Sequence, residues 1–359
     1  MAAPLPSTFA ASKWSRFATS FLVSAAALVL LLSSFVLVVD PYGTRAGPTR
    51  PPTPIMDLNQ RFMYPQIVRS RRYDSAVFGT STIRLLDPER LNALFGGRFA
   101  NLGLNAGTPW EQVQLMELFL RHVPAPKTLI FGLDPTWCEP DADVKRLTFR
   151  AFPPWLYDDR RLNDFAPLLS LKSLEIAGRV ALHWLGHMPA RIRADGYEVF
   201  VPPEAAYDLA RARLHIWGGA ERRMTTVEPP VGLSDAERAA LRMPALPWLE
   251  AVLGRLPEST VKILTFMPVH VAAQAAPGSR AFAEDEECKQ RIARIAERHT
   301  ATVVDFRRTS PVTTEDANYW DPLHYRIGIA ERIAAALHDA VKAGEDAPDG
   351  FYRVLARRR

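Results

Sequence analysis

The chain has 359 residues, of which 48% are hydrophobic and 23% are charged, and its formal net charge is +5. This composition excludes an intrinsically disordered chain, and the lack of a Lys/Arg stripe with interleaved aromatic residues argues against binding to nucleic acid. The small positive charge would favour an anionic envelope surface or polymer.

The amino terminus predicts a membrane anchor. Residues 17–39 carry no charge, and as a helix they would span about 34 Å, enough for a hydrocarbon core of about 30 Å. Lys13 and Arg16 precede this run and Asp40 follows it, so the positive-inside rule places residues 1–16 in the cytoplasm. A cleaved signal peptide is the alternative, although no small-x-small cleavage site follows. We therefore expect a single-pass protein of the bacterial inner (plasma) membrane, with its main domain periplasmic or extracellular.

After the anchor, residues 40–72 are rich in proline, with Pro41, Pro48, Pro51, Pro52 and Pro54 close together. This predicts a semi-rigid spacer that lifts the following domain off the membrane. We expect that domain to cover residues 73–345. Residues 346–359 are expected to form a basic tail, whose last three residues, 357–359, are predicted to be frayed.

Apolar runs and helical patterns alternate through most of the domain. The alternation predicts a parallel α/β sheet with helices between the strands. The expected strands cover residues 75–81, 98–105, 128–134, 261–267 and 302–306. One helix is expected to begin at Pro88, after the N-cap Asp87, and three others to cover residues 110–121, 280–298 and 326–341. Residues 140–245 lack this alternation and predict an insertion or lid over the sheet edge. Its aromatic residues could stack on sugar rings or pack the insertion onto the core.

Cysteine usage gives no sign of a bound metal ion. The two cysteines, Cys138 and Cys288, do not have a ligand spacing such as Cys-x-x-Cys. We expect no metal ion and no cofactor. In an oxidising compartment the two could pair, and two free thiols are the alternative.

Three residues have the chemistry of a hydrolase triad. Ser81 ends the first predicted strand, at the sheet edge where open α/β sheets bind ligands. Asp321 and His324 are three residues apart, so their side chains can meet in one turn. The imidazole would activate the serine and the carboxylate would orient the imidazole.

The order of these blocks resembles the SGNH, or GDSL-like, family of esterases and acyltransferases. The matching residues are Ser81, Gly103 after the second strand, Gly132 with Asp134 after the third, and Asp321 with His324. The resemblance covers about residues 73–135 and 260–340. It implies a three-layer, flavodoxin-like parallel sheet with helices on both faces.

The resemblance also implies an oxyanion hole. The backbone N–H groups of Ser81 and Gly103 would supply two donors, and the family takes the third from an asparagine side chain. This chain has Asp134 there, which cannot donate unless it is protonated. Asn105, just after Gly103, could substitute, or it could only stabilise a turn.

Four more residues are predicted near the substrate, in addition to Asp134. Arg84 could bind a substrate carboxylate or phosphate, or form a surface salt bridge. Trp137 and Trp320 could wall an acyl pocket or fill the top of the core. His270, at the end of the fourth strand, could contact substrate or replace His324 as the base.

The anchor and the resemblance together predict a function. The resemblance is to the membrane-anchored, extracytoplasmic branch that acetylates polysaccharides, so we expect a serine esterase or O-acyltransferase acting on an envelope polysaccharide or glycan. The alternative is a non-catalytic scaffold that binds glycan or a membrane-bound acyltransferase partner, which the Asp at 134 favours. A peptidase with the same triad is a third hypothesis.

Overall fold

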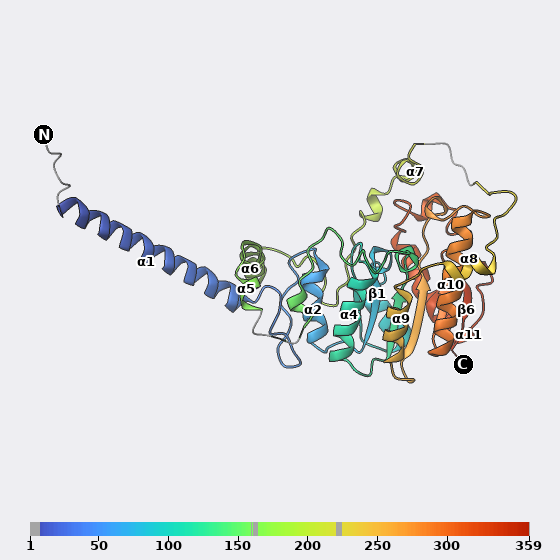
Figure 1. Cartoon of the computed structure of the whole chain (residues 1–359), viewed down its shortest axis with the longest axis horizontal. Helices are drawn as coiled ribbons and strands as arrows, with labels where there is room; N and C mark the ends of the chain where they lie inside the picture. The colour runs from blue at the N-terminus through green and yellow to red at the C-terminus, as the bar shows by residue number, and fades with distance from the viewer. Residues whose placement is uncertain (1–7, 159, 161–163, 220–224, 359) are drawn as a thin grey trace.

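A six-stranded sheet forms the centre of the molecule (Figure 1). The computed structural model describes residues 8–158, 160, 164–219 and 225–358. The strand order is β2-β1-β3-β4-β5-β6, in which β1 to β5 are parallel and β6 is antiparallel to β5. The strands are β1 Ser75–Gly79, β2 Phe99–Gly103, β3 Thr128–Gly132, β4 Val261–Phe266, β5 Thr302–Asp305 and β6 Arg353–Ala356. The five predicted strands and their parallel arrangement are confirmed.

The two faces of the sheet bury two separate apolar clusters. Successive residues of a strand point to opposite faces, so Phe78 and Phe131 belong to one cluster whereas Val77 and Ile130 belong to the other. The first cluster includes residues of α2 (Gln60–Arg69), α4 (Pro109–His122), α9 (Leu246–Gly254) and α10 (Arg280–Arg298). The second includes residues of α3 (Pro88–Phe95) and α11 (Ile327–Ala343). Both faces are therefore buried, which explains why the strands are nearly continuous apolar runs.

The predicted start of α3 is confirmed, and α4 begins one residue before the predicted helix 110–121. Asp87 is the N-cap of α3, its side chain accepts from the N–H of Glu89, and Pro88 occupies the first turn. Thr108 and Glu111 form a capping box at the start of α4.

Part of the predicted basic tail, residues 346–359, belongs to the sheet. Residues 353–356 form β6, in which Val354 pairs with Val304 of β5. Arg353 donates to Asp305 at 2.8 Å, and Asp305 is buried. The predicted domain end at residue 345 is wrong because this strand completes the sheet.

Residues 40–72 are not a spacer. Tyr42, Ile55 and Met56 are buried in the first apolar cluster, and Tyr42 packs against Phe62 and Trp155. Nine of the ten residues of α2 are buried. The prolines therefore shape a segment that packs on the domain.

The amino-terminal helix α1 (Thr8–Val39) projects away from the rest of the molecule (Figure 1). The stretch Lys13–Val39 is long and apolar enough to cross a membrane. Its carboxyl end joins the domain directly: Val36 and Val39 are buried, and Arg45 donates to the carbonyls of Leu37 and Val38 at 2.7 and 2.8 Å.

The insertion between β3 and β4 is irregular, as predicted. Within its described residues, 140–158, 160, 164–219 and 225–245, it contains no strand of the sheet. Its helices are α5 (Phe165–Leu168), α6 (Leu171–Trp184), α7 (Leu209–Trp217) and α8 (Asp235–Ala240). In Figure 1, α5 and α6 lie beside the carboxyl end of α1, and α7 lies far from it.

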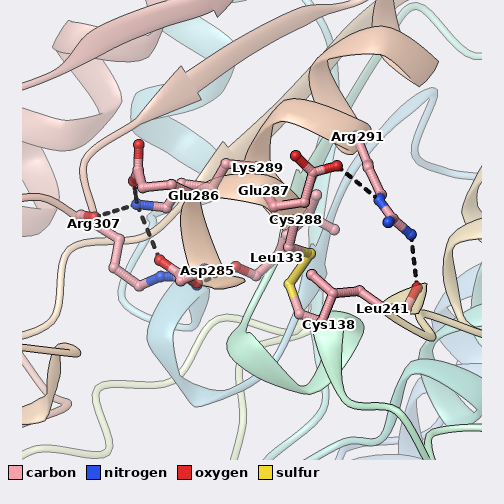
Figure 2. The surroundings of a disulfide bond; sticks show 10 residues. All are labelled: Leu133, Cys138, Leu241, Asp285, Glu286, Glu287, Cys288, Lys289, Arg291 and Arg307. Atoms are coloured by element: carbon pink, nitrogen blue, oxygen red, sulfur yellow. Dashed lines mark hydrogen bonds and ion pairs between the residues drawn. A yellow bond between two sulfur atoms is a disulfide. The ribbon is translucent and has the colours of Figure 1, made fainter. Parts of the chain in front are cut away.

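Cys138 and Cys288 form a disulfide, one of the two alternatives that the sequence left open (Figure 2). It joins the 3₁₀ turn η2 (Pro135–Cys138), after β3, to α10. Beside it, Arg307 donates to the carbonyl of Leu133 at 3.0 Å, and Lys289 donates to the carbonyl of Arg307 at 2.7 Å. These contacts tie the segments after β3 and β5 to α10.

Candidate active site

The turn that carries Ser81 rests on three glycines at the ends of neighbouring strands. Gly79, Gly103 and Gly132 end β1, β2 and β3. A Cβ added at any of them would come within 3.0 Å of the buried side chain of Ile83. Only glycine leaves room for Ile83 here, so these residues seat the 3₁₀ turn η1 (Ser81–Ile83) on the sheet edge.

Ser81, His324 and Asp321 come together in the arrangement of a triad. The Oγ of Ser81 lies 2.9 Å from Nε2 of His324, and Nδ1 of His324 lies 2.7 Å from Oδ2 of Asp321. Ser81 directly follows β1, whose neighbours are β2 on one side and β3 on the other. The order of the strands therefore reverses at this point, where open α/β sheets bind their ligands.

The loop of residues 316–326, which we name the Asp-His loop, is held from several sides. Tyr319 and Tyr325 form an isolated antiparallel bridge, and the N–H of Trp320 donates to the carbonyl of His324 at 2.9 Å. The hydroxyl of Tyr325 donates to the carbonyl of Thr82, next to Ser81. The loop and the serine turn are therefore fixed relative to each other.

Asp321 is kept ionised by its surroundings. Burial alone would raise its pKa, but the side chain of His324 and the N–H groups of Leu323 and His324 lower the pKa of Asp321 below its ordinary value. Those two N–H groups donate to Oδ1 at 2.8 and 3.0 Å, which leaves Oδ2 for the imidazole. The side chain of His324 is 22% exposed, so solvent and substrate can reach it.

Asp134 lies beside the serine turn in an environment that favours its neutral form. Its Oδ1 accepts from the hydroxyl of Thr82 at 3.0 Å, and its Oδ2 is buried with no hydrogen-bond partner among the described residues. Burial raises the pKa of Asp134, against the opposing effect of the hydroxyls of Thr80 and Thr82. A neutral carboxyl has an O–H donor, which is the group that the third oxyanion position requires.

The other expected oxyanion donors differ in availability. The N–H of Ser81 makes no hydrogen bond to any described residue. The N–H of Gly103, however, donates to Oδ1 of Asn101 at 3.1 Å, so this donor is already engaged. Asn105 is half-buried, and its carbonyl accepts from Arg61 at 3.1 Å.

Arg84 and His270 are not free to bind substrate. Arg84 is buried, forms an ion pair with Glu198, and lies over the ring of Phe200 at 4.5 Å. His270 is fully buried, with Nε2 3.1 Å from Oδ1 of Asp316. This burial argues against both roles that the sequence left open for His270, contact with substrate and replacement of His324 as the base, because an enclosed imidazole cannot reach the substrate. Its backbone N–H instead donates to the carbonyl of Pro322 at 2.8 Å, which supports the Asp-His loop.

The two tryptophans predicted near the substrate lie in different environments. Trp137 is fully buried in the first apolar cluster, so it fills the core and does not wall an open pocket. Trp320 is half-buried on the Asp-His loop, with its ring edge-on to Tyr207 of the insertion at 5.0 Å. Trp320 therefore remains a candidate for contact with substrate.

The sequence missed two residues that connect the insertion to this site. Phe200 places its ring edge-on to the imidazole of His324, with the centroids 5.2 Å apart. Asp316 is buried and accepts from Arg213 at 2.9 Å and from the indole N–H of Trp217 at 3.1 Å, both in α7. No spacing in the irregular insertion points to Phe200, whereas an acidic residue five positions before Asp321 was a weak signal.

Neither a scan against protein-family models nor a search of curated proteins finds a match for this chain.

Proposed function

We propose that this protein is a membrane-anchored serine esterase or O-acyltransferase of the SGNH type, acting on acyl groups of a cell-envelope polysaccharide or glycan. The observation that carries the proposal is the continuous contact from Ser81 Oγ through the His324 ring to Asp321, at 2.9 and 2.7 Å. The strand order and the burial of both sheet faces are consistent with the flavodoxin-like, three-layer arrangement of that family.

The reaction would proceed through an acyl-serine. Ser81 Oγ attacks the acyl carbonyl carbon while Nε2 of His324 takes its proton, and Asp321 stabilises the imidazolium. The N–H of Ser81 and a neutral Asp134 would donate to the oxyanion. Collapse expels the alcohol, which receives the proton from His324. Water or a sugar hydroxyl then attacks the acyl carbonyl carbon while His324 takes its proton. The bond from that carbon to Ser81 Oγ breaks, His324 returns the proton to Oγ, and the acid or the new ester leaves.

The integration of α1 into the domain supports anchoring over cleavage. Removal of the helix would expose the core around Val36 and Val39 and would remove the carbonyls that Arg45 binds. The outward orientation follows from Lys13 and Arg16 before the apolar run and Asp40 after it. The disulfide of Cys138 and Cys288 is consistent with an oxidising compartment outside the cytoplasm.

The test is ester turnover by the full chain in detergent. We expect hydrolysis of p-nitrophenyl acetate and labelling by a fluorophosphonate, both lost in Ser81→Ala by a factor of about a thousand or more. Ser234→Ala is the matched control, because Ser234 caps the remote helix α8. The fluorophosphonate also detects a transferase that refuses small esters.

One observation favours a second candidate, a non-catalytic scaffold that binds glycan or a membrane-bound acyltransferase. The N–H of Gly103 is occupied by Asn101, which leaves the oxyanion hole with one fewer free donor. On this hypothesis Ser81→Ala keeps glycan binding, and the wild-type chain neither hydrolyses the ester nor takes the label.

A further inference from the structure

The outward side of α6 is apolar along its whole length. An apolar stripe of five residues, each three or four positions from the next, lies on one side of the helix and continues just past its end: Leu171, Leu174, Gly178, Leu182 and Leu185. Leu171 and Leu185 are 86% and 70% exposed. A side chain at Gly178 would meet nothing within 4 Å, so the middle of the stripe is uncovered too.

Apart from Leu174, which is partly buried against the first apolar cluster, the stripe is separate from the face that holds α6 on the molecule. That inner face consists of Ser173, Ile176, Ala177 and Val180, all buried. It belongs to the same apolar cluster as Val36 and Val39 of α1, and Ser173 Oγ donates to the hydroxyl of Tyr42 at 3.2 Å. The charged residues Lys172, Glu175 and Arg179 occupy a third side of the helix. The stripe therefore lies between a core face and a charged face, with no described residue covering its ends.

Neighbouring residues extend the apolar surface. Phe165 and Leu169 of the α5 segment and Trp184 at the end of α6 are each more than half exposed. Apolar residues gathered in this way on one surface indicate a protein or membrane contact. Trp is enriched at the lipid–water interface, where its ring is partly apolar and its N–H remains hydrated.

The position of α1 indicates which of these two contacts the apolar surface makes, because it places the surface at the membrane. The uncharged run Phe17–Val39 is only slightly longer than the hydrocarbon core, about 34 Å against about 30 Å. Its last turns therefore reach the lipid–water interface, and these are the turns that α6 packs against. In Figure 1, α1 runs across the view whereas α6 beside its end is seen largely end-on, so the two helices cross steeply. A helix that crosses a spanning helix at its end lies along the membrane surface.

We propose that α5 and α6 rest in the outer interface of the bilayer that α1 spans, with the apolar stripe inserted between the lipid headgroups. The proposal rests on the anchoring part of the proposed function and not on the triad. The charged side of α6 would face water, as in other interfacial helices. Two contacts then hold the domain on the membrane, the spanning helix and the surface helix.

The experiment uses the full chain in nanodiscs of phosphatidylcholine with phosphatidylglycerol. Leu171→Cys or Leu185→Cys is labelled with a fluorophore sensitive to polarity; Cys138 and Cys288 are bonded to each other and do not react. Nitroxide lipids labelled near the headgroup should quench both sites at least about twofold more than the same label at Leu214→Cys. Leu214 is a matched exposed leucine, 56% exposed on the distant α7.

A fourth label, at Val29→Cys in the middle of α1, separates the two ways of failing. One outcome is that nitroxides deep in the bilayer quench the label at position 29, while the labels at positions 171 and 185 are in surroundings as polar as the label at 214. This outcome would contradict the interfacial position of α6 and leave the membrane anchor intact. Absence of quenching at position 29 overturns the anchor and this proposal with it. A third outcome is that the labels at 171 and 185 are in apolar surroundings, are not quenched by nitroxide lipids, and crosslink between chains. The stripe would then contact a second copy of the chain, and the lipid contact would be contradicted.

Discussion

The edge of the sheet and the insertion of residues 140–245 meet at the triad, and they contribute to it in different ways. The sheet edge carries the serine turn and its glycine seat, and the loop after β5 carries His324 and Asp321. The insertion supplies no member of the triad, but it packs Phe200 on the imidazole and holds Asp316 through α7. The triad residues therefore come from the sheet edge and the loop after β5, whereas their orientation also depends on the irregular insertion.

The largest effect on ester turnover should follow from a substitution in the triad itself. In Asp321→Asn the remaining oxygen still accepts from the N–H groups of Leu323 and His324, but the charge that stabilises the imidazolium is gone. We expect ester turnover to fall by about 10³ to 10⁴ with little change in Tm. Asp349→Asn, at an exposed ion pair with Arg332, is the matched control. A loss of less than tenfold would show that Asp321 does not serve the reaction.

The second prediction sharpens the role of Asp134 through pH. Because burial raises its folded pKa, the neutral donor is lost as pH rises through that pKa, and turnover of the wild type should fall over the same pH range. Asp134→Asn donates at every pH, so it should remove this fall, which amounts to about a hundredfold where the wild-type group is ionised. The measurement is a pH profile of kcat/KM for both proteins. Profiles of the same shape in both proteins would exclude Asp134 from the oxyanion site.

The same substitution has a stability readout with a definite sign. A carboxyl whose folded pKa is raised binds more protons in the folded state, so the free energy of unfolding declines as pH rises from its ordinary pKa toward the folded pKa. Asp134→Asn should therefore have a higher Tm relative to the wild type above the folded pKa of Asp134, and this relative gain should shrink as pH falls below that pKa. A constant difference across pH would contradict the raised pKa.

The third prediction concerns the contacts between the insertion and Asp316. Asp316→Asn removes the charge that Arg213 and His270 face in a buried position. We expect the free energy of unfolding to fall by about 2–3 kcal/mol, less than for a fully enclosed pair because Arg213 is half exposed. Proteolysis within the insertion should also become faster. The fully exposed Asp235, changed to Asn, is the control for urea denaturation.

The smallest effect is expected from Phe200→Ala. The imidazole keeps both hydrogen bonds but loses the ring packed on its side, and Arg84 loses its contact with that ring. Turnover should fall by about tenfold through kcat, because a misplaced catalytic group costs rate. Phe149→Ala, at an 88% exposed phenylalanine of the insertion, should leave turnover unchanged. Equal activities of the two variants would show that the insertion does not orient His324.

The regular part of the fold could be predicted because its signals are local. Each parallel strand is a short apolar run, and caps such as Asp87 mark the helix starts. The contact of Asp321 with His324 was also predictable from their spacing. The contact with Ser81, 243 residues away, followed only from the rule that the carboxyl ends of parallel strands share one edge.

The errors come from residues whose roles depend on distant partners. Arg84 follows Ser81 by three residues and His270 follows the fourth predicted strand, yet Glu198 and Asp316 pair with them inside the protein. Gly103 fits the expected donor position, but the glycine is also needed because Ile83 packs on it, and its N–H is bound to Asn101. The proline-rich segment and the basic tail have the composition of exposed chain, and only their contacts with α2 and β5 show that they are packed.

The direct join between α1 and the domain would also limit how the proposed enzyme reaches a substrate. A domain on a flexible linker would sample many positions above the bilayer. Here the burial of Val36 and Val39 and the hydrogen bonds of Arg45 make the junction rigid. In the proposed orientation Ser81 stays at one height above the lipid, and the protein explores its surroundings by drifting in the plane of the membrane. Only polymer strands that pass through that thin layer would come within reach.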